Sequence, residues 1–114
     1  MDFNQYQKKT KKTAIYPDSS VEYSTDGVMY TSLGLASEAG EVAGKIKKIF
    51  RDENGYFNYN NRLPVLDEMG DVLWYISELA SLLGTDLETI AQMNIDKLEG
   101  RKERGVIGGS GDDR

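Results

Sequence analysis

Two pairs of carboxylates, each spaced three residues apart, are the residues in this sequence best suited to chemistry. Glu38 and Glu41 form the first pair, and Glu68 and Asp71 form the second. On a helix, this spacing places both members of a pair on one face, one turn apart. If two such helices pack together, their carboxylates converge, and a cation or protons must neutralise them. Mg²⁺ is the economical cation because it prefers oxygen ligands and shares them with substrate phosphates.

The composition limits the chemistry that can surround these pairs. The chain has 114 residues and contains neither cysteine nor histidine. Disulfides, thiolate sites, His-ligated zinc and Ser–His triads are therefore excluded. The net charge of −5 disfavours a nucleic-acid partner, because phosphate contacts need a basic face. A small anionic substrate remains compatible where bound cations reverse the local charge.

The sequence contains no pattern typical of a membrane protein or an exported one. No apolar run approaches the roughly 18 residues that a membrane span needs. Residues 1–13 are polar and rich in lysine, unlike a signal peptide. We therefore predict a cytoplasmic protein with no membrane partner, built as a single domain because 114 residues suit one core.

The apolar pattern predicts two helices that position the acidic pairs. Residues 28–50 place their apolar side chains in a stripe about 80° wide around the helix. Residues 64–83 contain a second stripe of the same kind. Glu38 and Glu68 each lie at the edge of an apolar stripe. Glu41 and Asp71 lie on the same side of their helices, at a greater angle from the stripe. A glutamate that only contacts solvent would more often lie on the opposite face.

A further long helix is predicted after Thr85-Asp86-Leu87-Glu88, which supplies a cap and an acidic first turn. One line along this helix begins with apolar residues and continues with Asn94, Lys97 and Arg101. A helix face that only contacts solvent seldom changes in this way. These three polar residues can therefore face the carboxylates and contact an anionic substrate.

The whole pattern predicts an all-α fold of four helices in a bundle-like arrangement, because no convincing strand alternation appears. Within the single domain we distinguish an N-terminal helix and loop (1–27), a helical core with the acidic motifs (28–104) and a Gly-rich tail (105–114). Several amphipathic helices carry more apolar surface than one short bundle buries, which predicts an oligomer.

Three segments of the chain, residues 33–48, 67–75 and 94–101, resemble the MazG-like nucleoside triphosphate pyrophosphohydrolases. The family's signature is ExxE followed, after a spacer, by ExxD. The resemblance extends from about residue 30 to residue 104. It implies a MazG-type all-α fold that assembles as a homodimer or homotetramer, and the sequence does not choose between these assemblies.

The resemblance also implies an activity, the hydrolysis of a (d)NTP between its α and β phosphates to a (d)NMP and pyrophosphate. Such an enzyme can clear non-standard or excess nucleotides. By the same resemblance, Glu38, Glu41, Glu68 and Asp71 bind Mg²⁺, with Mn²⁺ as a substitute. Because the chain lacks histidine, a carboxylate is the most available general base, and Glu38 and Glu41 are the candidates for that role.

Five further residues are candidates for substrate binding: Lys45, Trp74, Asn94, Lys97 and Arg101. By resemblance, the last three hold phosphates or sugar. Lys45 lies on the helix face between the first two carboxylates, where it contacts either phosphate or Glu41. Trp74 and Tyr75 either line a base pocket or pack in the core or a subunit interface.

Two alternatives to this activity stay open. Phosphoribosyl-ATP pyrophosphohydrolases share the helices and the acidic motifs. A helical interaction module, in which the acidic pairs are solvated, would bind no nucleotide at all. Turnover of nucleotides with and without Mg²⁺ discriminates among the three.

Overall fold

The computed structural model describes all 114 residues and contains helices but no strand. The elements in chain order are α1 (Phe3–Thr10), the 3-10 helix η1 (Lys11–Thr13), α2 (Thr25–Asp52), α3 (Leu63–Leu82) and α4 (Leu87–Glu103). The predicted all-α class is confirmed. None of the helices is both long enough and apolar enough to cross a membrane.

Side-chain caps and one glycine determine where the helices begin and end. Asp86 caps α4 by accepting a hydrogen bond from the Thr89 N–H at 2.7 Å. Gly84, with φ of +71°, follows the end of α3 in the left-handed conformation that glycine adopts at little cost. Helix α2 begins about one turn before the predicted residue 28. The reason is Ser24, whose hydroxyl accepts from the Gly27 N–H at 3.2 Å and caps the helix there.

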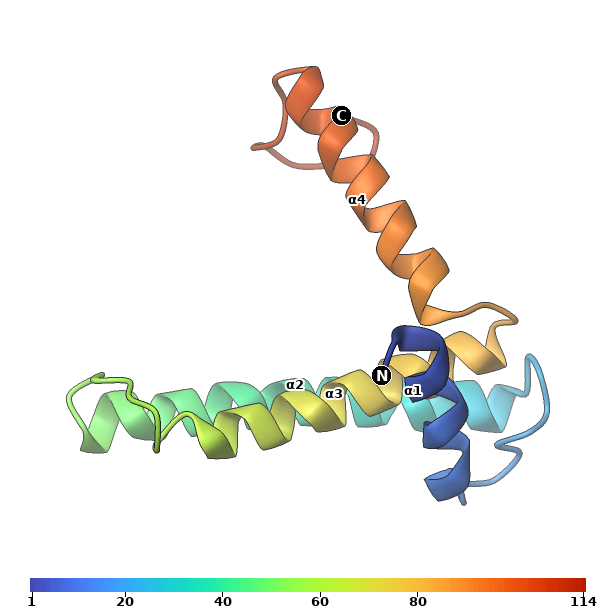
Figure 1. Ribbon diagram of the computed structural model, residues 1–114, viewed down its shortest axis with the longest axis horizontal. Helices are drawn as coiled ribbons and strands as arrows, with labels where there is room; N and C mark the ends of the chain where they lie inside the picture. Colours follow the sequence, from blue (N-terminus) through green and yellow to red (C-terminus); the bar gives the residue numbers. More distant parts are fainter.

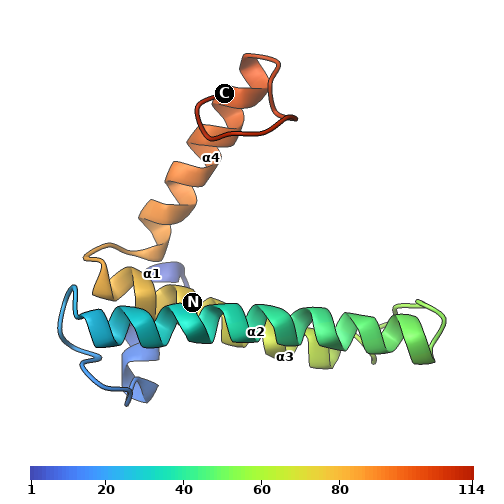
Figure 2. The ribbon, with the colours of Figure 1, turned by 180° about the vertical axis from the view of Figure 1, so that it is seen from behind.

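Helices α2 and α3 form a long hairpin that makes the most extensive helix–helix contact in the molecule. Figures 1 and 2 show the two helices side by side along the long axis of the molecule, with α1 crossing them near one end. The predicted apolar stripes meet along this hairpin but are covered only in part. Ile49 and Val65 are buried, whereas Met69 remains 51% exposed.

Helix α4 leaves the hairpin instead of packing along it (Figure 1). Its first turn is anchored, because Leu87 is buried and its N–H donates to the Gln7 side chain at 2.9 Å. Beyond that turn most side chains of α4 are exposed to solvent, both polar ones such as Asn94 and Lys97 and the apolar Met93. The four helices therefore do not form the predicted bundle-like arrangement within one chain.

The Gly-rich tail folds back along the end of α4. Arg101 donates from Nη2 to the Asp112 carbonyl at 3.2 Å, and Arg114 donates from Nε to the Gly108 carbonyl at 3.0 Å. Two arginines thus hold a segment whose apolar side chains are limited to Val106 and Ile107. The tail remains at the far end of α4, away from the hairpin (Figure 1).

Candidate functional site

Three of the four carboxylates predicted to bind metal lie together in the hairpin. Glu38 of α2 and Glu68 and Asp71 of α3 each offer one oxygen, and these oxygens lie within 4.8 Å of one another. Glu38 and Glu68 are half-buried, while Asp71 is exposed and open to a ligand from solvent. Carboxylate oxygens are the ligands that hard divalent cations prefer, and three of them converge here. The donor set therefore fits Mg²⁺ or Mn²⁺.

The electrostatics of Glu38 support the same conclusion. Partial burial is the main cause that raises its pKa, followed by hydrogen bonding with Glu68. Repulsion from Asp71, Glu68 and Glu41 raises the pKa further. A carboxyl group in this situation gains from either a proton or a cation. The cluster is therefore a favourable place for positive charge.

Glu41 and Lys45 are the two predicted site residues of α2 that lie outside the group of three carboxylates. Glu41 is exposed and is not among the three carboxylates that converge, which agrees with its position further round α2. The Lys45 ammonium is 3.9 Å from Glu68 Oε1, so its partner lies across the hairpin and not one turn away at Glu41. The roles of Glu41 as a fourth ligand and of Lys45 as a phosphate contact stay predictions.

A pocket of about 280 Å³ opens beside the carboxylates, lined by Thr13, Glu38, Asp71, Trp74 and Tyr75. The Trp74 Nε1–H donates to Thr13 Oγ1 at 2.8 Å. The Trp74 and Tyr75 rings meet edge to face, with centroids 5.0 Å apart. Trp74 therefore lines the pocket and also packs against its neighbours. The sequence analysis had given these two roles as alternatives.

Tyr75 reaches the carboxylates because α2 carries a glycine opposite it. A Cβ at position 34 would overlap the Tyr75 ring. Burial is the main cause that raises the pKa of Tyr75, and the neighbouring Tyr30, Glu38 and Asp71 raise it further. The phenol thus stays protonated next to the carboxylates and can donate a hydrogen bond there.

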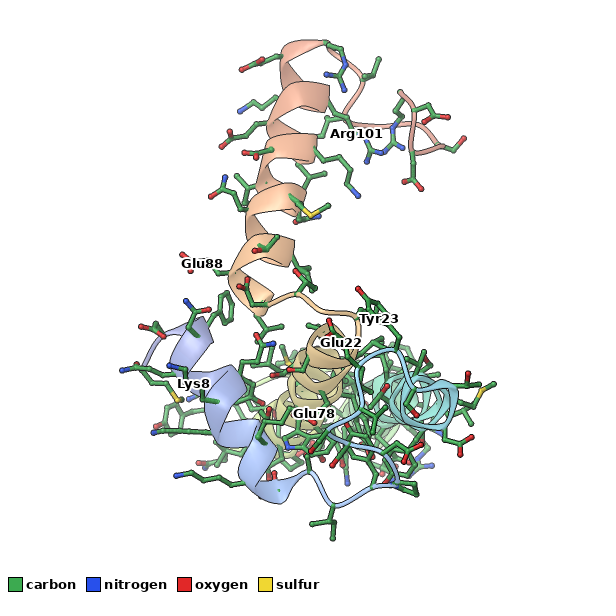
Figure 3. The ribbon with its side chains drawn as sticks, turned by 90° about the vertical axis from the view of Figure 1, so that its right-hand side faces the viewer. Lys8, Glu22, Tyr23, Glu78, Glu88 and Arg101 are labelled. Atoms are coloured by element: carbon green, nitrogen blue, oxygen red, sulfur yellow. The ribbon has the colours of Figure 1, made fainter.

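The polar residues of α4 are not brought to the carboxylates in this chain. Asn94 and Lys97 are exposed to solvent along α4. Arg101 is only 5% exposed, but its Nη2 faces the carbonyls of Gly111 and Asp112 in the tail. Figure 3 shows Arg101 at the far end of α4, well separated from Glu78 on α3. One chain alone therefore does not assemble the predicted site across three helices.

The sequence analysis did not single out Thr13, which lines the pocket, or Glu78, which is buried further along α3. Thr13 reaches the pocket only because the N-terminal segment crosses the hairpin, and no local pattern indicates such a crossing. Glu78 carries a detectable signal, since it lies seven residues after Asp71 and so on the same face of α3. Its contacts are described below.

The fold and the site define an all-helical protein with a carboxylate-lined pocket between two paired helices. Residues 29–106 match the MazG nucleotide pyrophosphohydrolase domain. The chain is also 48% identical over 109 residues to the "Gene 37 protein" of Mycobacterium phage L5, an alignment that covers 96% of each protein. No solved structure matches. The chain belongs to the MazG nucleotide pyrophosphohydrolase family, which confirms the resemblance seen in the sequence.

Proposed function

We propose that this protein is a Mg²⁺-dependent pyrophosphohydrolase that cleaves a (d)NTP between its α and β phosphates. The products are a (d)NMP and pyrophosphate, and the activity would remove unwanted nucleotides in the cytoplasm. The observation that carries the proposal is the convergence of Glu38, Glu68 and Asp71 in a chain of the MazG family. Three carboxylates at one point can bind a divalent cation, and that cation can in turn bind the phosphates of an anionic substrate.

Glu38, Glu68 and Asp71 would hold the cation. When bound, a divalent cation neutralises phosphate oxygens and makes a coordinated water a better nucleophile. Water attacks one of the two phosphorus atoms that share the α–β bridging oxygen, and pyrophosphate or the monophosphate leaves with that oxygen. Glu38 is the better placed of the two candidate bases because it lines the pocket and Glu41 does not.

The side chains around the cluster can bind the rest of the nucleotide. Lys45, next to Glu68, offers a positive charge on the rim of the cluster. Trp74 and Tyr75 offer aromatic surface in the pocket, which suits a base or a sugar. Together these residues would orient the triphosphate over the carboxylates.

We include a homodimer or homotetramer in the proposal. An apolar groove of about 520 Å³ runs along the hairpin and is lined by Ala39, Val42, Met69, Gly70, Val72, Leu73 and Ile76. Only 12 of 114 residues are buried in the single chain, a small core for this length. A second copy over the groove would bury these apolar side chains. In such an assembly, Asn94 and Lys97 of one copy can serve the carboxylates of another.

A nucleotide panel tests the activity. The protein is incubated with each (d)NTP and with phosphoribosyl-ATP, in Mg²⁺, in Mn²⁺ and in excess chelator. The products are separated to distinguish pyrophosphate release from phosphate release. We expect metal-dependent pyrophosphate release from at least one (d)NTP and none from the Glu68→Gln protein. Selective turnover of phosphoribosyl-ATP would favour that alternative, and no turnover of any nucleotide would favour an interaction module.

A further inference from the structure

A second carboxylate, outside the metal cluster, is completely buried in α3. Glu78 has no exposed surface and accepts three hydrogen bonds. The donors are Thr10 Oγ1 at 2.6 Å, Tyr16 OH at 2.8 Å and Lys11 Nζ at 3.0 Å. A buried carboxylate is tolerated only with such partners. All three come from residues 10–16, so Glu78 attaches this one segment to α3; Figure 3 shows Glu78 beside the N-terminal helix.

The attached segment also forms part of the pocket. Thr13 lies between the residues that bind Glu78 and ends the 3-10 helix η1. Its hydroxyl accepts the hydrogen bond from Trp74 Nε1 at 2.8 Å. Its side chain lines the pocket together with Glu38 and Asp71. The position of the Thr13 hydroxyl therefore depends on how the segment is attached.

Tyr16 provides a second connection between Glu78 and the pocket. Its ring stacks on Tyr30, with centroids 5.0 Å apart and planes at 10°, and meets Trp74 edge-on at 6.1 Å. Burial is the main cause that raises the pKa of Tyr16, and Glu78 raises it further, so the phenol remains a donor at neutral pH. Trp74 is thus held between Thr13 and Tyr16.

We propose that Glu78 is a positioning residue for one wall of the pocket. This wall consists of Thr13 and Trp74, and it faces the carboxylates. The proposal rests on the proposed function and adds a residue that contacts neither metal nor substrate. Because the wall lies beside the cluster and not within it, it sets how tightly the nucleoside part of the substrate binds. The bond-breaking step at the cluster does not depend on it.

Two variants weaken the wall at different points, and a third serves as a matched control. Glu78→Gln keeps the volume of the side chain but removes its charge. Thr13→Val keeps the shape but removes the acceptor for Trp74. The control, Asn4→Ala, breaks a different contact of the N-terminal helix, the exposed hydrogen bond from Asn4 Nδ2 to Glu88 Oε2 at 3.1 Å.

Steady-state kinetics on the preferred nucleotide give the first measurement. We expect KM to rise about ten-fold in Glu78→Gln and Thr13→Val, the order expected for one lost hydrogen bond, with kcat nearly unchanged. Asn4→Ala should change neither constant. The double variant should raise KM no further than Glu78→Gln alone, because both substitutions act through the placement of the same Thr13–Trp74 pair.

Fluorescence gives a second measurement that needs no turnover. Trp74 is the only tryptophan in the chain. Its emission should move to longer wavelength in Glu78→Gln and Thr13→Val, as the ring loses its partner and meets water, and should not move in Asn4→Ala. A purely structural role for Glu78 would lower stability without this selective shift and without the split between KM and kcat.

The outcomes separate this proposal from the one on which it rests. A folded Glu78→Gln protein with wild-type KM and wild-type emission overturns the role of Glu78 alone. Effects of Glu78→Gln and Thr13→Val that add independently overturn it as well. If Glu78→Gln does not fold, wild-type KM in Thr13→Val overturns it. A wild-type protein that hydrolyses no nucleotide overturns the proposed function, and the role of Glu78 in it.

Discussion

At the scale of single residues, Glu38 is the side chain on which the chemistry of the site depends most. It is half-buried and faces two other carboxylates, so its negative charge is opposed from several directions. A cation would remove this repulsion, which makes metal binding and the stability of the folded chain interdependent. While no cation is bound, partial burial, hydrogen bonding with Glu68 and this repulsion together raise the pKa of Glu38.

Replacing Glu38 by glutamine should abolish the stabilisation that metal provides. We expect Mn²⁺ at about 100 times its dissociation constant to stabilise the wild type by about 2.7 kcal/mol. The Glu38→Gln protein should gain little from metal, while its metal-free form should be as stable as the wild type or more so, because one repelling charge is gone. Thermal unfolding with and without Mn²⁺ measures both effects.

The corresponding change at Glu41 discriminates between two sets of ligands. The sequence motif includes Glu41 among them, whereas the structure leaves it exposed and outside the group of three. We expect the Glu41→Gln protein to keep its stabilisation by Mn²⁺. Loss of that stabilisation would instead support Glu41 as a fourth metal ligand, as the sequence motif predicts.

Because of Tyr16, the free energy of unfolding should fall as the pH becomes alkaline. Burial and Glu78 raise its pKa above the ordinary value of 10.0. The folded state therefore binds its proton more tightly than the unfolded state, and this contribution is fully present below about pH 10. It is lost as the pH rises through the raised pKa. Tyr16→Phe should reduce this alkaline loss, and at lower pH it should cost about 1–3 kcal/mol, since Glu78 loses a donor.

Urea unfolding at a series of pH values tests this dependence. The matched control is Tyr56→Phe, because Tyr56 is 74% exposed. The control should follow the wild type over the whole pH range. An alkaline loss of stability that is the same in Tyr16→Phe as in the wild type would show that another group is responsible.

At the scale of secondary structure, α2 carries two glycines with opposite roles. Gly34 allows close packing, because a Cβ there would overlap the Tyr75 ring, whereas a Cβ at Gly40 would meet nothing within 4 Å. Gly34 therefore positions a pocket residue. Gly40 only weakens the helix, unless a second copy of the chain packs against it.

Alanine substitutions at these two positions should change stability in opposite directions. Gly34→Ala should cost about 1–3 kcal/mol, because the Tyr75 ring must move, and should impair turnover. Gly40→Ala should stabilise the chain by about 0.5–1 kcal/mol through the better helix propensity of alanine. Denaturant unfolding measures both. A loss of stability in Gly40→Ala that depends on protein concentration would indicate a helix of another copy at this face.

At the scale of the whole molecule, the apolar groove along the hairpin and the projecting α4 both indicate that one chain is incomplete. Sedimentation velocity should show a dimer or a tetramer. Met69→Lys puts a charge into the groove at a residue that is 51% exposed in the single chain, and it should shift the protein toward monomer. The control is Ile15→Lys, at a residue that is 94% exposed and outside the groove. A wild-type protein that sediments as a monomer at all concentrations would contradict the proposed assembly.

The sequence by itself determined those features of the protein that depend only on residues close together along the chain. The helical extents follow from apolar periodicity and caps, and the structure places them within about a turn of the predicted ends. The spacing of three residues within each acidic pair is also local, which is why Glu68 and Asp71 lie on one face of α3 and join Glu38. The family follows from the same motifs.

Only the tertiary structure decided which distant groups meet. The packing of α2 on α3 selected Glu38 and left Glu41 in solvent, and it gave Lys45 a partner across the hairpin. The crossing of the N-terminal segment brought Thr13 to the pocket, and Thr10 of the same segment donates to the buried Glu78. Such contacts depend on the relative placement of whole elements, and the periodicity within one element carries no information about that placement.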